Sequence, residues 1–159
     1  MSIEARYYGD TAKQYDAKRQ TTRTHRDENT AFDTLLAKAG SHAELRTVLD
    51  LPCGTGRWIA RLQKANLDYC GVDISADMLR QAAKIQPELP SGSLRLVEAS
   101  WLDFLPSHAK AFDLVVSTRF INWWNENEGA KLVHWLCDAA RFFAILHVRV
   151  DETIAQRAL

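Results

Sequence analysis

The chain contains 159 residues, of which 47% are hydrophobic, so its length and composition suit one domain with a buried core rather than a disordered segment. Its 20 basic and 20 acidic residues give a formal net charge of zero, which argues against binding to DNA or an anionic membrane through overall charge. No apolar run approaches the roughly 20 residues that cross a bilayer, and the N-terminal sequence lacks the apolar stretch of a signal peptide. Three widely spaced cysteines (Cys53, Cys70 and Cys137) favour reduced thiols in a cytoplasmic protein over a disulfide framework or a zinc site.

The predicted elements alternate between helices and strands. Up to Arg46 the sequence is polar and helical in pattern, with apolar residues recurring between Ala31 and Ala39 and with Gly40 as a stop signal. Five apolar runs then predict strands, at residues 47–51, 69–74, 94–97, 112–117 and 142–150. Residues 57–65, 76–86 and 126–138 are predicted to form helices, and the polar segment 98–111 is predicted to be mostly loop.

Strands that alternate with helices imply parallel pairing and right-handed crossovers. The strands are continuously apolar, as expected when helices cover both faces of a sheet. The sequence therefore predicts an α/β fold with a doubly wound, mostly parallel sheet of about five strands. We expect a single domain over residues 1–159, with a helical N-terminal cap (1–46), a core (47–150) and a tail (151–159).

The most informative segment follows the first predicted strand, where Asp50 is followed by a turn that carries Gly54 and Gly56. Glycine allows positive φ and lets a ligand approach the backbone closely, and open parallel sheets bind ligands outside the carboxyl ends of their strands. Asp73 ends the next strand, where a carboxylate can accept hydrogen bonds from both hydroxyls of a ribose. The two glycines also fit a simple tight turn. Ile59 stands where a dinucleotide-binding turn needs a third glycine, and no Gly-Lys-Ser/Thr indicates a P-loop.

The segment Asp50-Leu-Pro-Cys-Gly-Thr-Gly56 resembles the D-x-G-x-G-x-G turn of class I S-adenosylmethionine-dependent methyltransferases. Residues 69–79, 98–106 and 112–118 resemble that family's second strand, adenine-side loop and fourth strand, in the same order. The resemblance implies a Rossmann-like fold, S-adenosylmethionine as the cofactor and methyl transfer to an acceptor. Because the cofactor is already activated, a general base is optional, and we assign no catalytic residue and no metal ligand.

The resemblance also implies cofactor contacts, residue by residue. They fall on Asp50, Leu51, Pro52, Cys53, Gly54 and Gly56 in the turn, on Asp73, Ile74 and Met78 at the ribose and adenine, on Ser100 and Trp101 at the other side of the adenine, and on Ser117 and Thr118 at the methionine end. Pro52 departs from the family's glycine and has no N–H to donate, but Gly54 and Gly56 are retained, so we expect binding to survive.

The N-terminal segment resembles that of family members that methylate small molecules, in which a tyrosine and a basic residue close over the cofactor. Tyr15 and Arg26 fit those places. An arginine can bind the cofactor carboxylate through two hydrogen bonds. The alternative is that Tyr15 packs on the domain and that Arg26 is a solvated charge on a helix.

The acceptor pocket is expected after the fourth strand, near Arg119, Asn122, Trp123 and Trp124. Adjacent tryptophans cannot share one helix face, so either one of them lines the pocket or both cover the sheet edge. His134 and His147 are the histidines nearest the predicted core, and each could act as a base or have a structural role. We interpret Cys53 as a small packing residue.

The function that the resemblance implies is methyl transfer to a small molecule, and the neutral charge argues against a nucleic-acid acceptor. A degenerate cofactor-binding or interaction module without turnover is the first alternative, and a NAD-type dinucleotide-binding domain is the second. The family continues beyond the fifth strand with a helix and a hairpin, which nine residues after Val150 cannot supply. We therefore expect a homodimer across the open edge of that strand, or a longer polypeptide that supplies the missing strands, unless the tail shields the edge.

Overall fold

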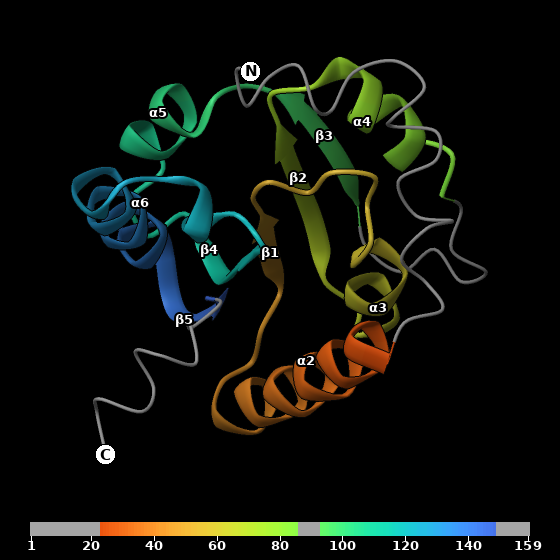
Figure 1. Ribbon diagram of the computed structural model, residues 1–159. Coiled ribbons are helices and arrows are strands. Elements are labelled where there is room, and N and C mark those ends of the chain that lie inside the picture. The colour runs from red at the N-terminus through yellow and green to blue at the C-terminus, as the bar shows by residue number, and fades with distance from the viewer. Residues whose placement is uncertain (1–22, 86–92, 149–159) are drawn as a thin grey trace.

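A computed structural model describes residues 23–85 and 93–148 of the chain. At its centre is a sheet of five parallel strands in the order β3-β2-β1-β4-β5 (Figure 1). The strands are β1 (Thr47–Asp50), β2 (Asp68–Asp73), β3 (Leu94–Glu98), β4 (Phe112–Thr118) and β5 (Ala140–His147). The predicted α/β fold with a parallel sheet of five strands is confirmed.

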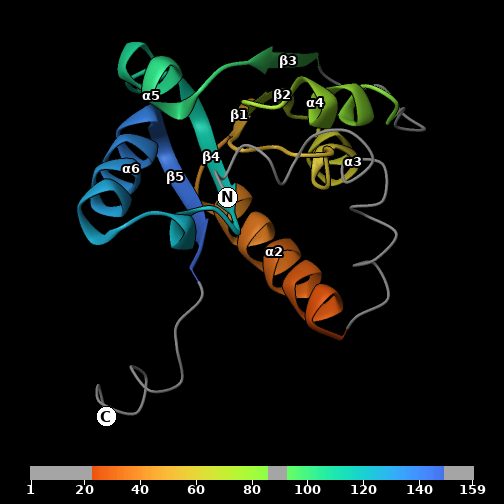
Figure 2. The same cartoon turned by 45° about the horizontal axis from the view of Figure 1, so that its top comes forward.

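Helices cover both faces of this sheet (Figures 1 and 2). One layer consists of α2 (Arg23–His42), α3 (Ile59–Lys64) and α4 (Ala76–Ala82), and the other of α5 (Trp101–Phe104), the 3₁₀ helix η2 (Leu105–Ser107) and α6 (Glu126–Ala139). In β1, Val48 packs toward the first layer and Leu49 toward the second, and both side chains are fully buried. Burial on both faces explains why the central strands are apolar at successive positions.

The order of the strands creates a switch point between β1 and β4. From β1 the chain adds β2 and β3 on one side, and it then adds β4 and β5 on the other. The strand ends are in register, because Asp50 lies opposite both Gly71 of β2 and Val116 of β4. In open α/β sheets ligands bind at this position, outside the carboxyl ends of the strands.

Several predicted helix boundaries were wrong. The helix α2 continues past Gly40 to His42, and α4 ends at Ala82 rather than near residue 86. The helix after the glycine-rich turn begins at Ile59 instead of residue 57, because the turn itself extends through Trp58, with the Ile59 amide bonded to the carbonyl oxygen of Gly56 at 3.1 Å. Residues 1–22, 86–92 and 149–159 lie outside the described residues, and so does the predicted end of the fifth strand at 149–150.

The segment 98–111, predicted to be mostly loop, contains α5 and η2. The hydroxyl of Ser100 accepts a hydrogen bond from the Leu102 amide at 3.0 Å and so caps α5. Trp101 and Phe104 are buried against the sheet, which supplies the packing that stabilises so short a helix. Pro106 lies in the first turn of η2, where a missing N–H is tolerated.

A buried carboxylate at the amino end of the sheet leads to a first prediction. Asp113 Oδ2 accepts hydrogen bonds from the amides of Arg46 and Thr47, each at 3.0 Å, and Oδ1 accepts one from Arg141 Nη1 at 2.6 Å. Asp113→Ala removes all three hydrogen bonds and is expected to lower the free energy of unfolding by about 2–4 kcal/mol. Urea unfolding measures this loss. The control Glu44→Ala breaks an exposed ion pair with Arg46 and should change stability by no more than about 0.5–1 kcal/mol. Equal losses in the two variants would contradict the prediction.

Candidate functional site

The glycine-rich turn joins β1 to α3 at the switch point. The amide of Cys53 donates to the carbonyl oxygen of Val72 at 2.9 Å, and the amide of Gly54 donates to Asp73 Oδ2 at 2.9 Å, so the turn lies against the end of β2. The Leu51–Pro52 peptide is cis. Gly54 and Gly56 have positive φ angles of +55° and +81°, in the region that favours glycine.

The two glycines have different surroundings. A Cβ atom at Gly54 would meet no atom of residues 23–85 and 93–148 within 4 Å, so within this part of the chain the turn leaves space at the carboxyl edge of the sheet. At Gly56 the same atom would lie 2.4 Å from Ile59 Cδ1 and 3.1 Å from Ala82 Cβ. Gly56 therefore allows α3 and α4 to pack closely, whereas Gly54 leaves room for a ligand beside the backbone.

Asp50 is fully buried beneath the turn. Its Oδ2 accepts a hydrogen bond from the Tyr69 hydroxyl at 2.6 Å, and its Oδ1 has no partner among the described residues. Burial raises the pKa of Asp50 to about 7, an effect that the Tyr69 hydroxyl opposes and the charge of Asp73 reinforces. The same burial raises the pKa of the Cys53 thiol, so this cysteine is a packing residue and not an activated nucleophile.

The raised pKa of Asp50 predicts how stability depends on pH. The folded state binds the proton more tightly than the unfolded state, whose carboxyl titrates near 3.8, so unfolding releases a proton between these two values. Stability is therefore lost as pH rises from about 4 through 7. Asp50→Asn keeps an acceptor for Tyr69 and removes this titration, so the stability of the variant relative to wild type should rise by about 2–3 kcal/mol between pH 5 and pH 8. Urea unfolding of both proteins at the two pH values tests this. Parallel pH profiles would contradict it.

Asp73 ends β2 and is bound by backbone amides. Its Oδ1 accepts from Ser75 N and its Oδ2 from Gly54 N, both at 2.9 Å. Burial raises the pKa of this carboxyl, and the backbone amides of Ser75, Gly54 and Ile74 oppose the shift. Each carboxylate oxygen has a second lone pair, so Asp73 can accept further hydrogen bonds from a ligand in the space beside Gly54.

The residues expected at the adenine differ in how far their side chains are exposed to solvent. Ile74 is 46% exposed beside Asp73, whereas Met78 and Trp101 are almost completely buried in the protein. Trp101 packs edge-to-face on Trp124 and Trp135, with centroid distances of 5.3 and 5.6 Å.

The sequence analysis did not single out Glu98, which is exposed and lies in register with Asp73. The available signal was an acid at the end of a strand, as at Asp50 and Asp73.

The end of β4 contributes to the same edge. Ser117 is fully buried, and its hydroxyl has no partner within the part of the chain that the structure describes. Thr118 Oγ1 accepts a hydrogen bond from Trp58 Nε1 at 3.1 Å, which connects β4 to the turn before α3. The structure thus brings the turn, Asp73 and the end of β4 together, as the sequence predicted.

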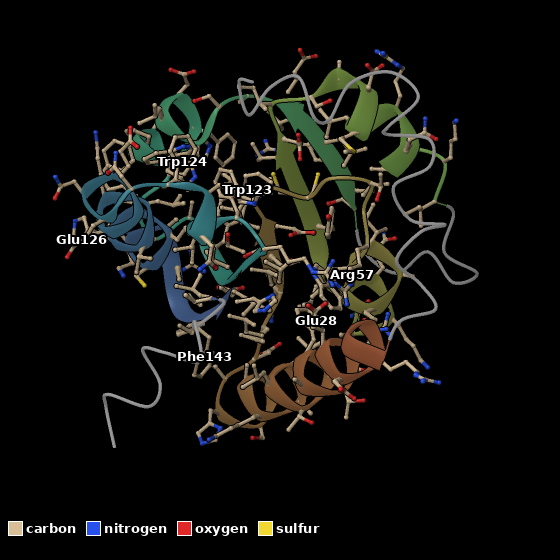
Figure 3. The ribbon with its side chains drawn as sticks, in the orientation of Figure 1. Glu28, Arg57, Trp123, Trp124, Glu126 and Phe143 are labelled. Carbon is tan, nitrogen blue, oxygen red and sulfur yellow. The ribbon has the colours of Figure 1, made fainter. Side chains whose placement is uncertain are left out.

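A cluster of charged residues lies at this edge, of which the sequence analysis named Arg119 and missed Glu28 and Arg57 (Figure 3). Glu28 of α2 and Arg57 of the turn point toward one another, with Oε2 and Nη1 2.7 Å apart. Glu28 also forms a side-on ion pair with Arg119, which follows β4. Arg26, the predicted cofactor ligand on this helix, is exposed, and Tyr15 lies outside the described residues.

The tryptophans after β4 lie in and beside η3 (Ile121–Trp123) instead of on a regular α-helix. Both are partly buried: Trp123 Nε1 donates to the carbonyl oxygen of Arg119 at 2.7 Å, and Trp124 packs edge-to-face on Phe120. His134 is exposed on α6, so the expectation that it lies near the core was wrong, because Leu132 and Leu136 form the buried face of that helix.

Two negative findings apply to residues 23–85 and 93–148. No three His, Cys, Asp or Glu side chains come together in a way that could hold a metal ion. None of the helices in these ranges combines the length and apolar character that crossing a membrane requires.

Comparisons with known proteins bear on the turn and the sheet. Residues 48–141 match a family model described as a methyltransferase domain. A malonyl-[acyl-carrier protein] O-methyltransferase of Pseudescherichia vulneris is 30% identical over 128 residues, which are 80% of this chain and 46% of that protein. The human mitochondrial protein named arginine-hydroxylase NDUFAF5 is 32% identical over an alignment of 131 residues, and the match covers 75% of this chain and 36% of that protein. The chain therefore spans less than half the length of these curated relatives.

Solved structures are similar in fold. The magnesium protoporphyrin IX methyltransferase ChlM of Synechocystis PCC 6803 with bound SAH superimposes with a TM-score of 0.72 at 14% identity, covering 98% of this chain and 76% of that one. A DhpI–SAM–HEP complex gives a TM-score of 0.69 at 18% identity, covering 98% and 70%. At these identities the likeness shows the fold alone.

Proposed function

Because the chain belongs to the class I S-adenosylmethionine-dependent methyltransferase family, we propose that it transfers a methyl group from S-adenosylmethionine to a small-molecule acceptor. The observation that carries this proposal is the arrangement at Gly54. Its amide is bound to Asp73, and no atom of the described residues would lie within 4 Å of a Cβ atom at this position. A ligand that reaches the backbone there also reaches the carboxylate.

The residues present fit the cofactor. Asp73 would hold the ribose with the lone pairs that the two amides leave, and Ile74 offers an exposed apolar side chain next to it. The buried carboxyl of Asp50, whose Oδ1 lacks a partner in the described part of the chain, would favour a cationic group nearby. When bound, the cofactor supplies a methyl group on a positively charged sulfur. The residues of this chain would bind and orient the reactants and exclude water.

Several observations support a small molecule as the acceptor. The net charge of zero provides no general attraction for nucleic acid. Among the structural neighbours, ChlM is named for a porphyrin, and the methyltransferase BpumL was solved with a plantazolicin analogue. The bacterial relative is named for a malonyl group on a carrier protein, so an acceptor presented on a carrier belongs in the test.

Calorimetry with S-adenosylhomocysteine, with NAD as the comparison, tests cofactor binding. Incubation with labelled S-adenosylmethionine and a panel of metabolites and acyl carriers, followed by mass spectrometry, tests turnover. A gain of one methyl group by a panel member supports the proposal. Cofactor binding without any product would favour a module without turnover.

We also propose that two copies pair through β5. Among the described residues this strand is bonded only to β4, and Phe142 on it is 50% exposed. An open strand edge recruits another strand. Light scattering at increasing concentration should show a dimer, and a monomer at all concentrations would contradict the pairing.

A reducing compartment such as the cytoplasm suits Cys53 and Cys70, which are buried free thiols.

A further inference from the structure

A buried pair of polar residues lies beneath the glycine-rich turn, where β1 and β2 run side by side. Asp50 is fully buried, and Tyr69 is 1% exposed. The Tyr69 hydroxyl donates to Asp50 Oδ2 at 2.6 Å, and Asp50 Oδ1 has no partner among the described residues. Within residues 23–85 and 93–148, the tyrosine is therefore the hydrogen-bond donor that holds this carboxyl in place.

The strand β2 is built so that the tyrosine ring reaches toward the ligand edge. Tyr69 lies opposite Val48, whereas Gly71 lies opposite Asp50. A Cβ atom at Gly71 would lie 2.8 Å from Tyr69 Cε1 and 2.9 Å from Cys53 Sγ, which is closer than packed atoms approach. The ring thus occupies the space that a side chain at Gly71 would need, and its hydroxyl extends to the end of β1.

The protonation of the Asp50 carboxyl depends on the groups that face it. Burial raises its pKa to about 7, the hydrogen bond from Tyr69 opposes this shift, the charge of Asp73 reinforces it and the charge of Arg57 opposes it. Burial also raises the pKa of the Cys53 thiol in the turn, so this neighbour stays uncharged. Near neutral pH the carboxyl therefore exchanges between two protonation states, and a positive charge at the ligand edge favours the ionised state.

We propose that Tyr69 is a positioning residue for the cofactor, and that through Asp50 it sets how strongly the site prefers a positively charged sulfur over a neutral one. Tyr69 is too deeply buried to touch a ligand, so it acts by stabilising the ionised carboxylate. A buried charge acts over several ångströms because the surrounding dielectric is low. The carboxyl loses its proton to solvent as the cation binds, and it regains the proton when the sulfur is neutral. The inference rests on the proposed function and adds the feature of the cofactor that the site distinguishes.

Two nucleosides that differ by one methyl group and one charge test the proposal. 5′-Methylthioadenosine has a neutral sulfur, and its S-methyl sulfonium derivative has a fixed positive charge. Neither carries the amino and carboxyl groups of the cofactor, so pH changes the protein and not the charge of the probe. Calorimetry between about pH 5 and pH 9 measures both affinities. Buffers with different ionisation enthalpies then count the protons that are released on binding.

The variants separate the hydroxyl from the carboxyl on which it acts. Tyr69→Phe removes only the hydroxyl, Asp50→Asn removes the titration, and the double variant combines them. The control is Cys70→Ala, which shortens a buried side chain on the opposite face of the same strand. All four variants are compared with wild type at each pH, and urea unfolding shows that each of them is folded.

Wild type should prefer the sulfonium about tenfold more at high pH than at low pH, with release of a proton near neutral pH. In Tyr69→Phe this rise should occur about one to two pH units higher, because a hydrogen bond to the charged carboxylate is lost. Its preference is then weaker than that of wild type near pH 8 and approaches it toward pH 9. Asp50→Asn and the double variant should show the same constant preference, and Cys70→Ala should match wild type.

The proposal is overturned if the preference of Tyr69→Phe rises at the same pH as that of wild type, since the hydroxyl would then only support the structure. It is also overturned if Tyr69→Phe alters the preference in the Asp50→Asn background. Should Tyr69→Phe not fold, 3-fluorotyrosine placed at Tyr69 keeps the ring and is a stronger donor, so the rise should move to lower pH. Wild type that binds both nucleosides with a preference independent of pH overturns this proposal alone. Wild type that binds neither nucleoside nor S-adenosylhomocysteine refutes the proposed function as well.

Discussion

Alanine at Gly54 is expected to weaken cofactor binding at least tenfold while the protein stays folded. The new methyl group would enter the space beside the turn, where the cofactor is proposed to contact the protein backbone. Because this methyl group meets no atom of the described residues within 4 Å, the expected loss of stability comes from the positive φ, about 1–2 kcal/mol. A tenfold change in affinity corresponds to about 1.4 kcal/mol of binding free energy.

Alanine at Gly56 is the matched control, because its main expected effect is on the free energy of unfolding and not on direct contact with the cofactor. Its Cβ would lie 2.4 Å from Cδ1 of Ile59, so this fully buried side chain would have to shift against its packed neighbours. Positive φ and overpacking together should lower the free energy of unfolding by about 2–5 kcal/mol. Urea unfolding and calorimetry with S-adenosylhomocysteine separate the two effects. A Gly54→Ala variant with wild-type affinity would show that the cofactor does not approach the turn at this position.

The second large effect is expected at Asp73, where alanine should weaken cofactor binding by about 10- to 150-fold. The ribose hydroxyls would lose a charged acceptor, and such hydrogen bonds contribute about 1.5–3 kcal/mol. Asp73→Ala also leaves the amides of Gly54 and Ser75 without their acceptor, so stability should fall by about 2–4 kcal/mol. Asp73→Asn retains one acceptor oxygen and should fall between wild type and alanine in both measurements.

Asp68 provides the control for Asp73 because it lies at the other end of β2. Its Oδ1 accepts hydrogen bonds from the amide and hydroxyl of Ser93, at 2.6 and 3.0 Å, so Asp68→Ala also removes an acceptor of a backbone amide. The cofactor affinity of Asp68→Ala should equal that of wild type. If folded Asp73→Ala binds S-adenosylhomocysteine as wild type does, Asp73 has no part in ribose recognition.

The sheet could be predicted from the sequence because its strands are continuous apolar runs between polar segments. Val48, Leu49 and the centre of β4 are buried on both faces, and this burial is what the apolar pattern encodes. The short helix α5 could not be predicted in the same way. It has only one turn, and packing of Trp101 and Phe104 on the sheet stabilises it more than its local sequence does.

The candidate site was predictable where its residues follow a strand directly. Gly54, Asp73 and Ser117 each lie at or just after a carboxyl end, so topology alone brings them together. The contact between Glu28 and Arg119 spans 91 residues, and no local pattern in the sequence indicates it. The polar helix therefore offered several charged side chains without showing which one reaches the site.

The order of the strands also affects how the protein is assembled during synthesis. The central strand β1 receives its two neighbours at very different times, because Val48 pairs with Tyr69 on one side and with Leu114 on the other. A chain that emerges from the ribosome N-terminus first can join β1 to β2 and β3 early, while the other edge of β1 has no partner until β4 follows. Val48 and Leu49 belong to the fully buried core only after that step. Before β4 joins, a nascent chain exposes the sheet of β1, β2 and β3 with its apolar residues and the free edge of β1. A chaperone that acts during this interval would protect the chain from aggregation.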